Sequence, residues 1–107
     1  MRELLWRPRA KLDIESIALY LGFERRSPQA AQKAVRSIDA TIARIRQFPD
    51  SGGRLALEGL VHEYRTAHAN PYTVFYRFDD EAVTIYRILH QRQDIDARAI
   101  VDLADEG

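Results

Sequence analysis

Charged side chains with possible chemistry gather in the second half of the chain, where the sequence favours β-strands. Arg65, Arg77 and Arg87 fall in or next to three neighbouring predicted strands, and Arg92 follows the last of them. A strand disfavours charge unless one face of its sheet is open to solvent. Two interpretations stay open: surface ion pairs, each worth at most about 1 kcal/mol, or a cationic groove for an acidic protein segment or an RNA phosphate.

Other kinds of site find little support in the residue types. The histidines His62, His68 and His90 have no spacing that clusters metal ligands, and the chain has no cysteine, so we expect no metal site. The carboxylates at 79–81 lie in a predicted hairpin turn, where Asp is favoured for local hydrogen bonding. The pair Gly52-Gly53 lacks the Lys and the following helix of a phosphate-binding loop. It is predicted to be a flexible loop, and we expect no cofactor.

Length and composition indicate one globular domain, which we expect to span residues 1–107. No apolar run approaches the roughly 20 residues that cross a bilayer. The N-terminus has no apolar stretch of signal-peptide length, and the absence of cysteine suits a reducing cytosol. We therefore expect a cytoplasmic protein with no membrane partner.

The charge balance argues against a nucleic acid as the main ligand. The chain carries 16 basic and 16 acidic residues, and the segment 94–107 holds five of the acidic ones and one basic residue. Proteins that bind nucleic acid are usually clearly basic, because phosphate contacts supply most of the affinity. We expect no direct, specific nucleic-acid binding. All basic residues except Lys11 and Lys33 are arginines, which suit bidentate contacts with proteins.

Two amphipathic segments make up the first half of the chain. After a short predicted strand at residues 3–6, Pro8 fits the first turn of a helix that ends near Gly22. Ser27, followed by a proline, is a typical N-cap for a second helix that runs to about Gln47. Two consecutive helices with so short a link predict an antiparallel hairpin.

After this helical half the hydrophobic period changes to two. The segment 62–67 is a possible strand, and 72–78 and 82–90 are strong strands joined by the polar turn 79–81. Helical spacing at 95–104 predicts a short last helix. The order is β-α-α-β-β-β(-α). Because strands alone cannot bury both faces, we expect an α+β domain in which the helical hairpin packs on one face of an antiparallel sheet, with the other face open to a partner.

These elements, in this order, resemble the RelE/ParE toxin superfamily over nearly the whole chain, with ParE as the most similar branch. The most specific stretch is 87–94, Arg-Ile-Leu-His-Gln-Arg-Gln-Asp. It resembles the closing strand of ParE-type toxins: an aliphatic pair, then His, then Arg, then Asp. Supporting pieces follow the family order along the chain: Asp13-Ile14, Phe48-Pro49, Tyr64-Arg65 and Val74-Phe75-Tyr76-Arg77.

The resemblance implies the toxin of a type II toxin–antitoxin system. A ParD-like antitoxin would fold its disordered C-terminal part onto this chain, laying a helix and an extended segment across it. ParE-type toxins inhibit DNA gyrase, which implies a binding protein and no catalysis. The residues expected to contact the target or the antitoxin are Arg65, Arg77, Arg87, His90, Arg92 and Asp94.

Two alternatives within the superfamily remain open. RelE-type relatives cut mRNA on the ribosome without a metal, which needs an acid, a base and cations around the scissile phosphate. Here a reduced catalytic set would comprise Arg65, Arg77, Tyr86 and His90. The chain has no lysine after Lys33 and no net charge, and both facts favour gyrase inhibition over RNA cleavage. The other alternative is a non-toxic relative that keeps the fold and still binds the antitoxin.

Overall fold

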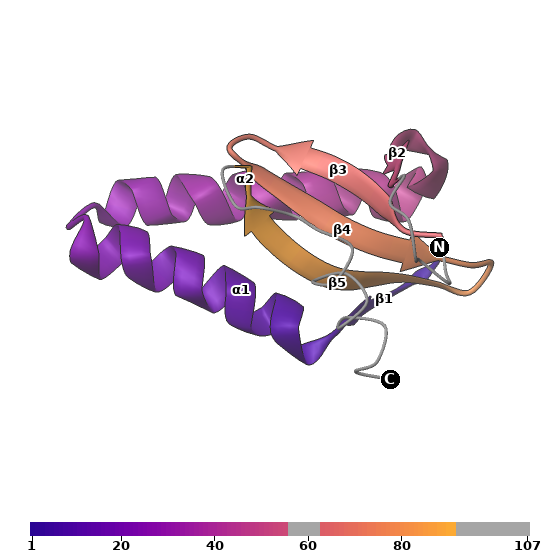
Figure 1. Cartoon of the computed structure of the whole chain (residues 1–107), viewed down its shortest axis with the longest axis horizontal. Coiled ribbons are helices and arrows are strands. Elements are labelled where there is room, and N and C mark those ends of the chain that lie inside the picture. Colours follow the sequence, from indigo (N-terminus) through magenta and orange to yellow (C-terminus); the bar gives the residue numbers. More distant parts are fainter. Residues whose placement is uncertain (56–62, 92–107) are drawn as a thin grey trace.

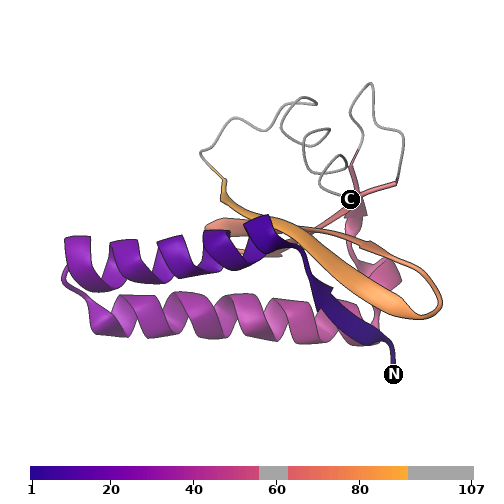
Figure 2. The ribbon, with the colours of Figure 1, turned by 90° about the horizontal axis from the view of Figure 1, so that it is seen from below.

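The computed structural model of the protein describes residues 1–55 and 63–91, in which two long helices lie against one face of a five-stranded sheet (Figures 1 and 2). His62, Arg92, Asp94 and the helix expected at 95–104 lie outside the described residues. In the part that the structure describes, no helix combines the length and the hydropathy needed to cross a membrane.

Both helices begin where the sequence predicts. Helix α1 spans Pro8–Leu19 and continues as a π-helical turn, η1, at Tyr20–Glu24. Helix α2 spans Pro28–Gln47, and the Ser27 hydroxyl accepts a hydrogen bond from the Ala30 N–H at 3.2 Å. That bond satisfies one of the backbone donors that a helix start leaves unpaired. A short 3₁₀ turn, η2 at Pro49–Ser51, follows α2.

The five strands form one sheet in the order β1-β5-β4-β3-β2. They are β1 at Glu3–Trp6, β2 at Gly53–Arg54, β3 at Arg65–Ala69, β4 at Tyr72–Phe78 and β5 at Ala82–His90. The predicted α+β fold is confirmed, with two differences. The sheet is mixed, because β1 runs parallel to β5, and the intervening helices supply the long crossover that a parallel pair needs. Gly53, expected in a flexible loop, pairs with β3 instead.

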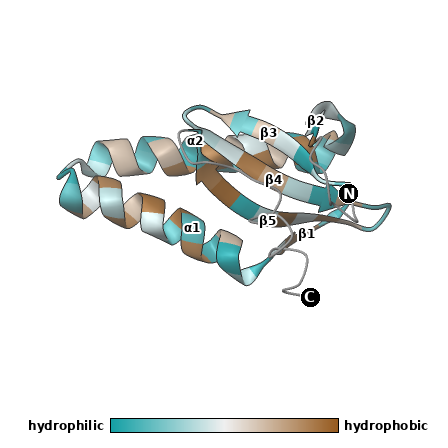
Figure 3. Cartoon of the chain, in the orientation of Figure 1, coloured by the Kyte–Doolittle hydropathy of each residue, from teal (hydrophilic) through white to brown (hydrophobic). Residues whose placement is uncertain are grey.

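The core lies between α2 and the sheet face that the helices cover. Alternate residues of the central strands, such as Val74 and Ile85, belong to the same core cluster as the apolar stripe of α2. That stripe consists of Ile38, Ile42 and Ile45, none more than 3% exposed. Hydrophobic residues (brown) recur along β4 and β5 (Figure 3). The pairing of β4 with β5 shifts register at Tyr86, so that Ile85 and Ile88 both belong to the core. A bulge of this kind lets the alternation restart without turning apolar residues to solvent.

The opposite sheet face is less open than the sequence predicts. Phe75 and Leu89 alternate with core residues, and yet they are only 1% and 6% exposed. Exposure of such side chains would cost about 25 cal/mol per Å² of apolar surface. The open part of this face lies toward β1, where Leu5 is 42% exposed.

Candidate functional site

Arg65 lies at the start of β3 and holds the turn that follows α2. Its guanidinium donates to the carbonyl oxygens of Gly52 at 2.9 Å and Asp50 at 3.2 Å. It also forms ion pairs with the carboxylates of Asp50 and Glu63, both at 3.4 Å, and its side chain is 11% exposed. Arg65 therefore has most of its hydrogen-bonding capacity engaged within the fold.

Arg87 has a structural partner on the first helix. Its guanidinium contacts the Asp13 carboxylate through two bonds of 2.7 and 3.0 Å, and the two side chains are 18% and 14% exposed. The same carboxylate accepts the backbone N–H of Ile88 at 2.9 Å. Asp13 thus supplies an acceptor to a backbone N–H on the edge of β5 beyond the end of β1, and it joins α1 to the sheet.

His90 lies at the far end of β5 from the β4–β5 turn. Its ring meets the ring of Tyr72 edge to face, with the centroids 5.5 Å apart. Tyr72 belongs to the core, and burial raises the pKa of its hydroxyl, with a smaller contribution from Tyr20. In the described part of the chain, His90 therefore lies against the edge of the core.

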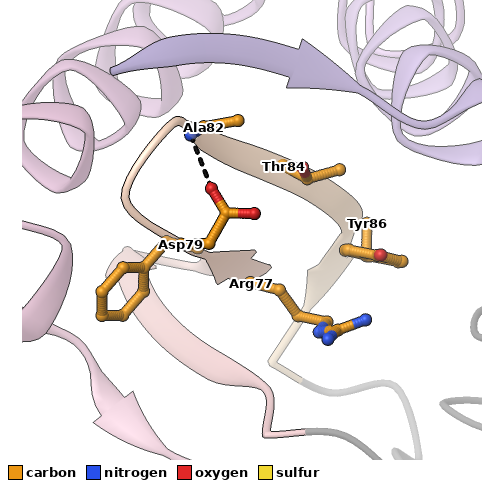
Figure 4. Close-up of a pocket in the computed structure, with 6 residues that line it drawn as sticks. Arg77, Asp79, Ala82, Thr84 and Tyr86 are labelled. Atoms are coloured by element: carbon orange, nitrogen blue, oxygen red, sulfur yellow. Dashed lines mark hydrogen bonds between the residues drawn. The ribbon is translucent and has the colours of Figure 1, made fainter. Parts of the chain in front are cut away.

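Arg77 and Tyr86 come together on the sheet face away from the helices (Figure 4). Arg77 lies over the ring of Tyr64 at 5.7 Å, and Tyr64 meets Tyr86 edge to face at 5.2 Å. Arg7 lies over the ring of Tyr86 at 5.7 Å. Arg77, Thr84 and Tyr86 line a cavity of about 150 Å³. Arg7 and Tyr64 contact these lining residues. We call Arg7, Tyr64, Arg77, Thr84 and Tyr86 the sheet patch.

Asp79, the acidic residue next to the sheet patch, accepts hydrogen bonds from the β4–β5 turn. One carboxylate oxygen of Asp79 accepts the backbone N–H groups of Glu81 at 2.8 Å and Ala82 at 2.9 Å. These two hydrogen bonds lower the pKa of Asp79, with smaller contributions from Arg2 and Arg77. Asp79 thus serves the turn, in agreement with the local role predicted for this acidic cluster.

The structure places the residues that were predicted to form one site in different parts of the fold. Arg77 and Tyr86 share the sheet patch, whereas Arg65 braces the turn after α2, and His90 lies against Tyr72. Sequence reasoning missed Arg7 and Tyr64. The alternation of residues along the first strand indicates that Arg7 lies on the face opposite Leu4 and Trp6. This places Arg7 near Tyr86 only once the pairing of that strand with β5 is known. Within the described ranges 1–55 and 63–91, no group of three or more acidic or histidine side chains could hold a metal ion.

A second surface runs along α1, α2 and β1, and Ile42 connects it to the α2 stripe that faces the sheet. Three adjoining cavities of about 360, 300 and 470 Å³ share residues along it. We call its apolar lining the helical groove: Leu4, Trp6, Ile14, Ala18, Val35 and Ile42. Charged side chains of both signs, such as Lys11, Glu15, Arg36 and Asp39, border it. This shape fits the apolar face of an amphipathic helix.

Comparisons with known proteins agree with this architecture. A sequence model described as "ParE toxin of type II toxin-antitoxin system, parDE" matches residues 4–95. No curated protein matches the sequence significantly. A solved structure of the chromosomal ParDE system from P. aeruginosa superposes with a TM-score of 0.63 at 25% identity, covering 84% of this chain and 96% of that chain.

Two solved structures of YafQ from E. coli share the fold. The protein from strain BL21(DE3) has a TM-score of 0.52 at 16% identity, and a point mutant has 0.50 at 20% identity. Each comparison covers 85% of this chain and 94% of the other. The family match covers most of the chain, and the element order agrees with it. This chain therefore belongs to the ParE toxin family of type II toxin–antitoxin systems.

Proposed function

We propose that this protein inhibits DNA gyrase by binding to it, and that a ParD-like antitoxin neutralises it. One observation carries the choice of binding over catalysis: Arg65 and His90 lie apart from Arg77 and Tyr86. Metal-free RNA cleavage requires an acid, a base and cations that converge on one phosphate. The described residues of the set expected for that chemistry do not converge, which supports a toxin that acts by contact.

The helical groove supports the antitoxin partner. An amphipathic antitoxin helix would place its apolar residues against Ile14, Val35 and Trp6, while charged residues at the border select its orientation. An extended segment that follows this helix would continue across the sheet and cover the target-binding face. Folding upon binding suits such an arrangement, because a disordered segment can wrap a large surface. We place the pair in the cytoplasm, where gyrase acts.

A supercoiling assay tests the proposal directly. Purified protein should block supercoiling of relaxed plasmid by gyrase and ATP, or stabilise cleaved plasmid, and addition of the antitoxin should restore activity. A ribosome-containing translation extract, analysed for mRNA cleavage, is the parallel arm. Cleavage of mRNA without an effect on gyrase would replace this function with ribosome-dependent RNA cleavage. Antitoxin binding without either activity would indicate a non-toxic relative.

A further inference from the structure

Three ring contacts connect two guanidinium groups across the sheet patch. Arg7 covers a face of Tyr86, Tyr86 meets Tyr64 edge to face, and Arg77 covers a face of Tyr64. Cation–π contacts of this kind orient a guanidinium group while its N–H donors remain available to an oxygen ligand. The two cations are therefore held in place by aromatic rings.

Within the part of the chain that the structure describes, the two arginines of the sheet patch have no ion-pair partner. Among residues 1–55 and 63–91, neither Arg7 nor Arg77 forms an ion pair, whereas Arg65 and Arg87 each do. Asp79, at the edge of the cavity, is already held by two backbone N–H groups. A carboxylate supplied from outside would complement both guanidinium groups.

The aromatic rings of the patch are poor platforms for nucleic-acid bases. Tyr64 is fully buried, and Arg7 already covers one face of Tyr86. Proteins that bind single-stranded nucleic acid stack successive bases on accessible aromatic faces. The chain also has no net charge, which limits its affinity for a phosphate backbone. These facts favour a protein ligand over RNA.

Strand register adds a hydroxyl and an apolar contact beside the guanidinium of Arg77. Leu5 on β1 pairs with Thr84 on β5, and Thr84 pairs with Arg77 on β4. The three residues therefore form one row across the sheet face, and Leu5 is exposed. Such a row can receive a carboxylate at Arg77 and Thr84 and an apolar side chain at Leu5.

We propose that the sheet patch binds an acidic segment of the protein target, with carboxylates at Arg7 and Arg77. This inference rests on the proposed function, since it concerns the surface through which the toxin engages a protein. The target and the antitoxin helix would then use different surfaces of the toxin: the sheet patch and the helical groove.

Direct binding can be measured by fluorescence anisotropy with a labelled peptide rich in Asp, Glu and Leu. Its counterpart with Asn and Gln in place of the acids, and a single-stranded RNA, serve as competing probes. Arg77→Gln and Arg7→Gln should each weaken binding of the acidic peptide about tenfold. Arg54→Gln, at a solvent-exposed arginine on β2, should change it less than about twofold.

Folding of each variant is checked by circular dichroism, and Arg77→Lys provides a second variant that retains the charge. Lysine lacks the planar group that stacks on Tyr64, so it should restore binding only in part. Tighter binding of RNA than of the acidic peptide would overturn the proposal. An equal loss of binding in Arg54→Gln would overturn it as well.

The gyrase assay separates failure of this inference from failure of the proposed function. Arg77→Gln should need about tenfold more protein to inhibit supercoiling and should still capture the antitoxin through the helical groove. Full inhibition by Arg77→Gln would refute the role of the sheet patch while leaving gyrase inhibition intact. If wild-type protein does not inhibit gyrase, the proposed function fails, and the peptide measurements still decide whether the patch binds carboxylates.

Discussion

At the scale of single residues, one tyrosine hydroxyl ties the end of α2 to the sheet. The hydroxyl of Tyr76 donates to the Pro49 carbonyl at 2.6 Å and accepts the Gly52 N–H at 3.1 Å. Tyr76 itself is fully buried. A buried polar group that loses its partner costs more free energy than the hydrogen bond contributes. The turn after α2 therefore depends on this one side chain together with Arg65.

Substitution of Tyr76 by Phe should lower the free energy of unfolding by about 2 kcal/mol, because the Pro49 carbonyl and the Gly52 N–H lose their partner. Burial raises the pKa of Tyr76 above its ordinary value. Because the folded state holds the Tyr76 proton more tightly than the unfolded state, the stabilisation is fully present below about pH 10. It is lost as the pH rises through the pKa of the folded state. Urea denaturation at neutral and alkaline pH should show a smaller alkaline loss in the variant than in wild type.

Tyr20→Phe is the matched control for that experiment, because Tyr20 is 48% exposed. Its stability at neutral pH should stay within about 0.5 kcal/mol of wild type. An unchanged neutral stability of Tyr76→Phe would contradict the bridging role of the hydroxyl.

Adjacent glycines offer a sharper contrast. A Cβ at Gly52 would lie 2.7 Å from the Thr66 carbonyl oxygen and would also crowd the Tyr76 hydroxyl, whereas a Cβ at Gly53 would lie 3.5 Å from the Thr66 Oγ1. Gly52→Ala should therefore cost about 2 kcal/mol, and Gly53→Ala should stay within about 0.5 kcal/mol of wild type. Equal urea midpoints for the two variants would show that space at Gly52 is not limiting.

At the scale of elements, the contact between α1 and β5 joins the two layers on one edge. Strand β1 pairs with β5 only as far as Ile85. Beyond that point, Asp13 on α1 takes the place of a further strand residue by accepting the Ile88 N–H and pairing with Arg87. This carboxylate therefore closes an edge that would otherwise expose an unpaired backbone donor.

Asp13→Ala should destabilise the protein by about 3 kcal/mol, because it leaves the Arg87 guanidinium largely buried without its counter-charge. Glu15→Ala, at an exposed position of the same helix, should shift the unfolding free energy by less than about 0.5 kcal/mol. The comparison requires only equilibrium urea curves for the two variants. A stability of Asp13→Ala close to that of Glu15→Ala would exclude the proposed role of this ion pair.

At the scale of the whole molecule, the two layers separate the candidate binding surfaces. The two helices lie on one side of the sheet (Figure 2). The sheet patch lies on the sheet face away from them, whereas the helical groove is lined by residues of α1, α2 and β1. Substitutions at well-separated sites without shared partners usually act independently. Toxicity and binding of the antitoxin helix should therefore be separable by mutation.

Val35→Arg, placed in the middle of the helical groove, tests that separation. A buried charge at the centre of an apolar interface should weaken antitoxin binding about tenfold or more while gyrase inhibition persists. Gln29→Arg introduces the same charge at an exposed position near the start of α2 and should bind the antitoxin like wild type. Isothermal titration calorimetry measures both affinities. Unaltered antitoxin binding by Val35→Arg would place the antitoxin elsewhere.

Local patterns in the sequence determined most of the secondary structure of this protein. The proline at the start of each helix, the Ser27 cap and the β-branched and aromatic runs at 72–78 and 82–90 are short-range signals, and the structure confirms each element. The proximity of Arg77 and Tyr86 also follows from these patterns, because adjacent strands of a hairpin bring alternate residues together.

Only the tertiary structure decided which arginines remain available to a partner. Arg87 finds its carboxylate 74 positions away and Arg65 finds carbonyl acceptors 13 and 15 positions away, and neither pairing has a local signature. The parallel pairing of β1 with β5 places Arg7 beside Tyr86. Contacts of this kind depend on how whole elements pack, whereas periodicity reports only the neighbours of each residue along its own helix or strand.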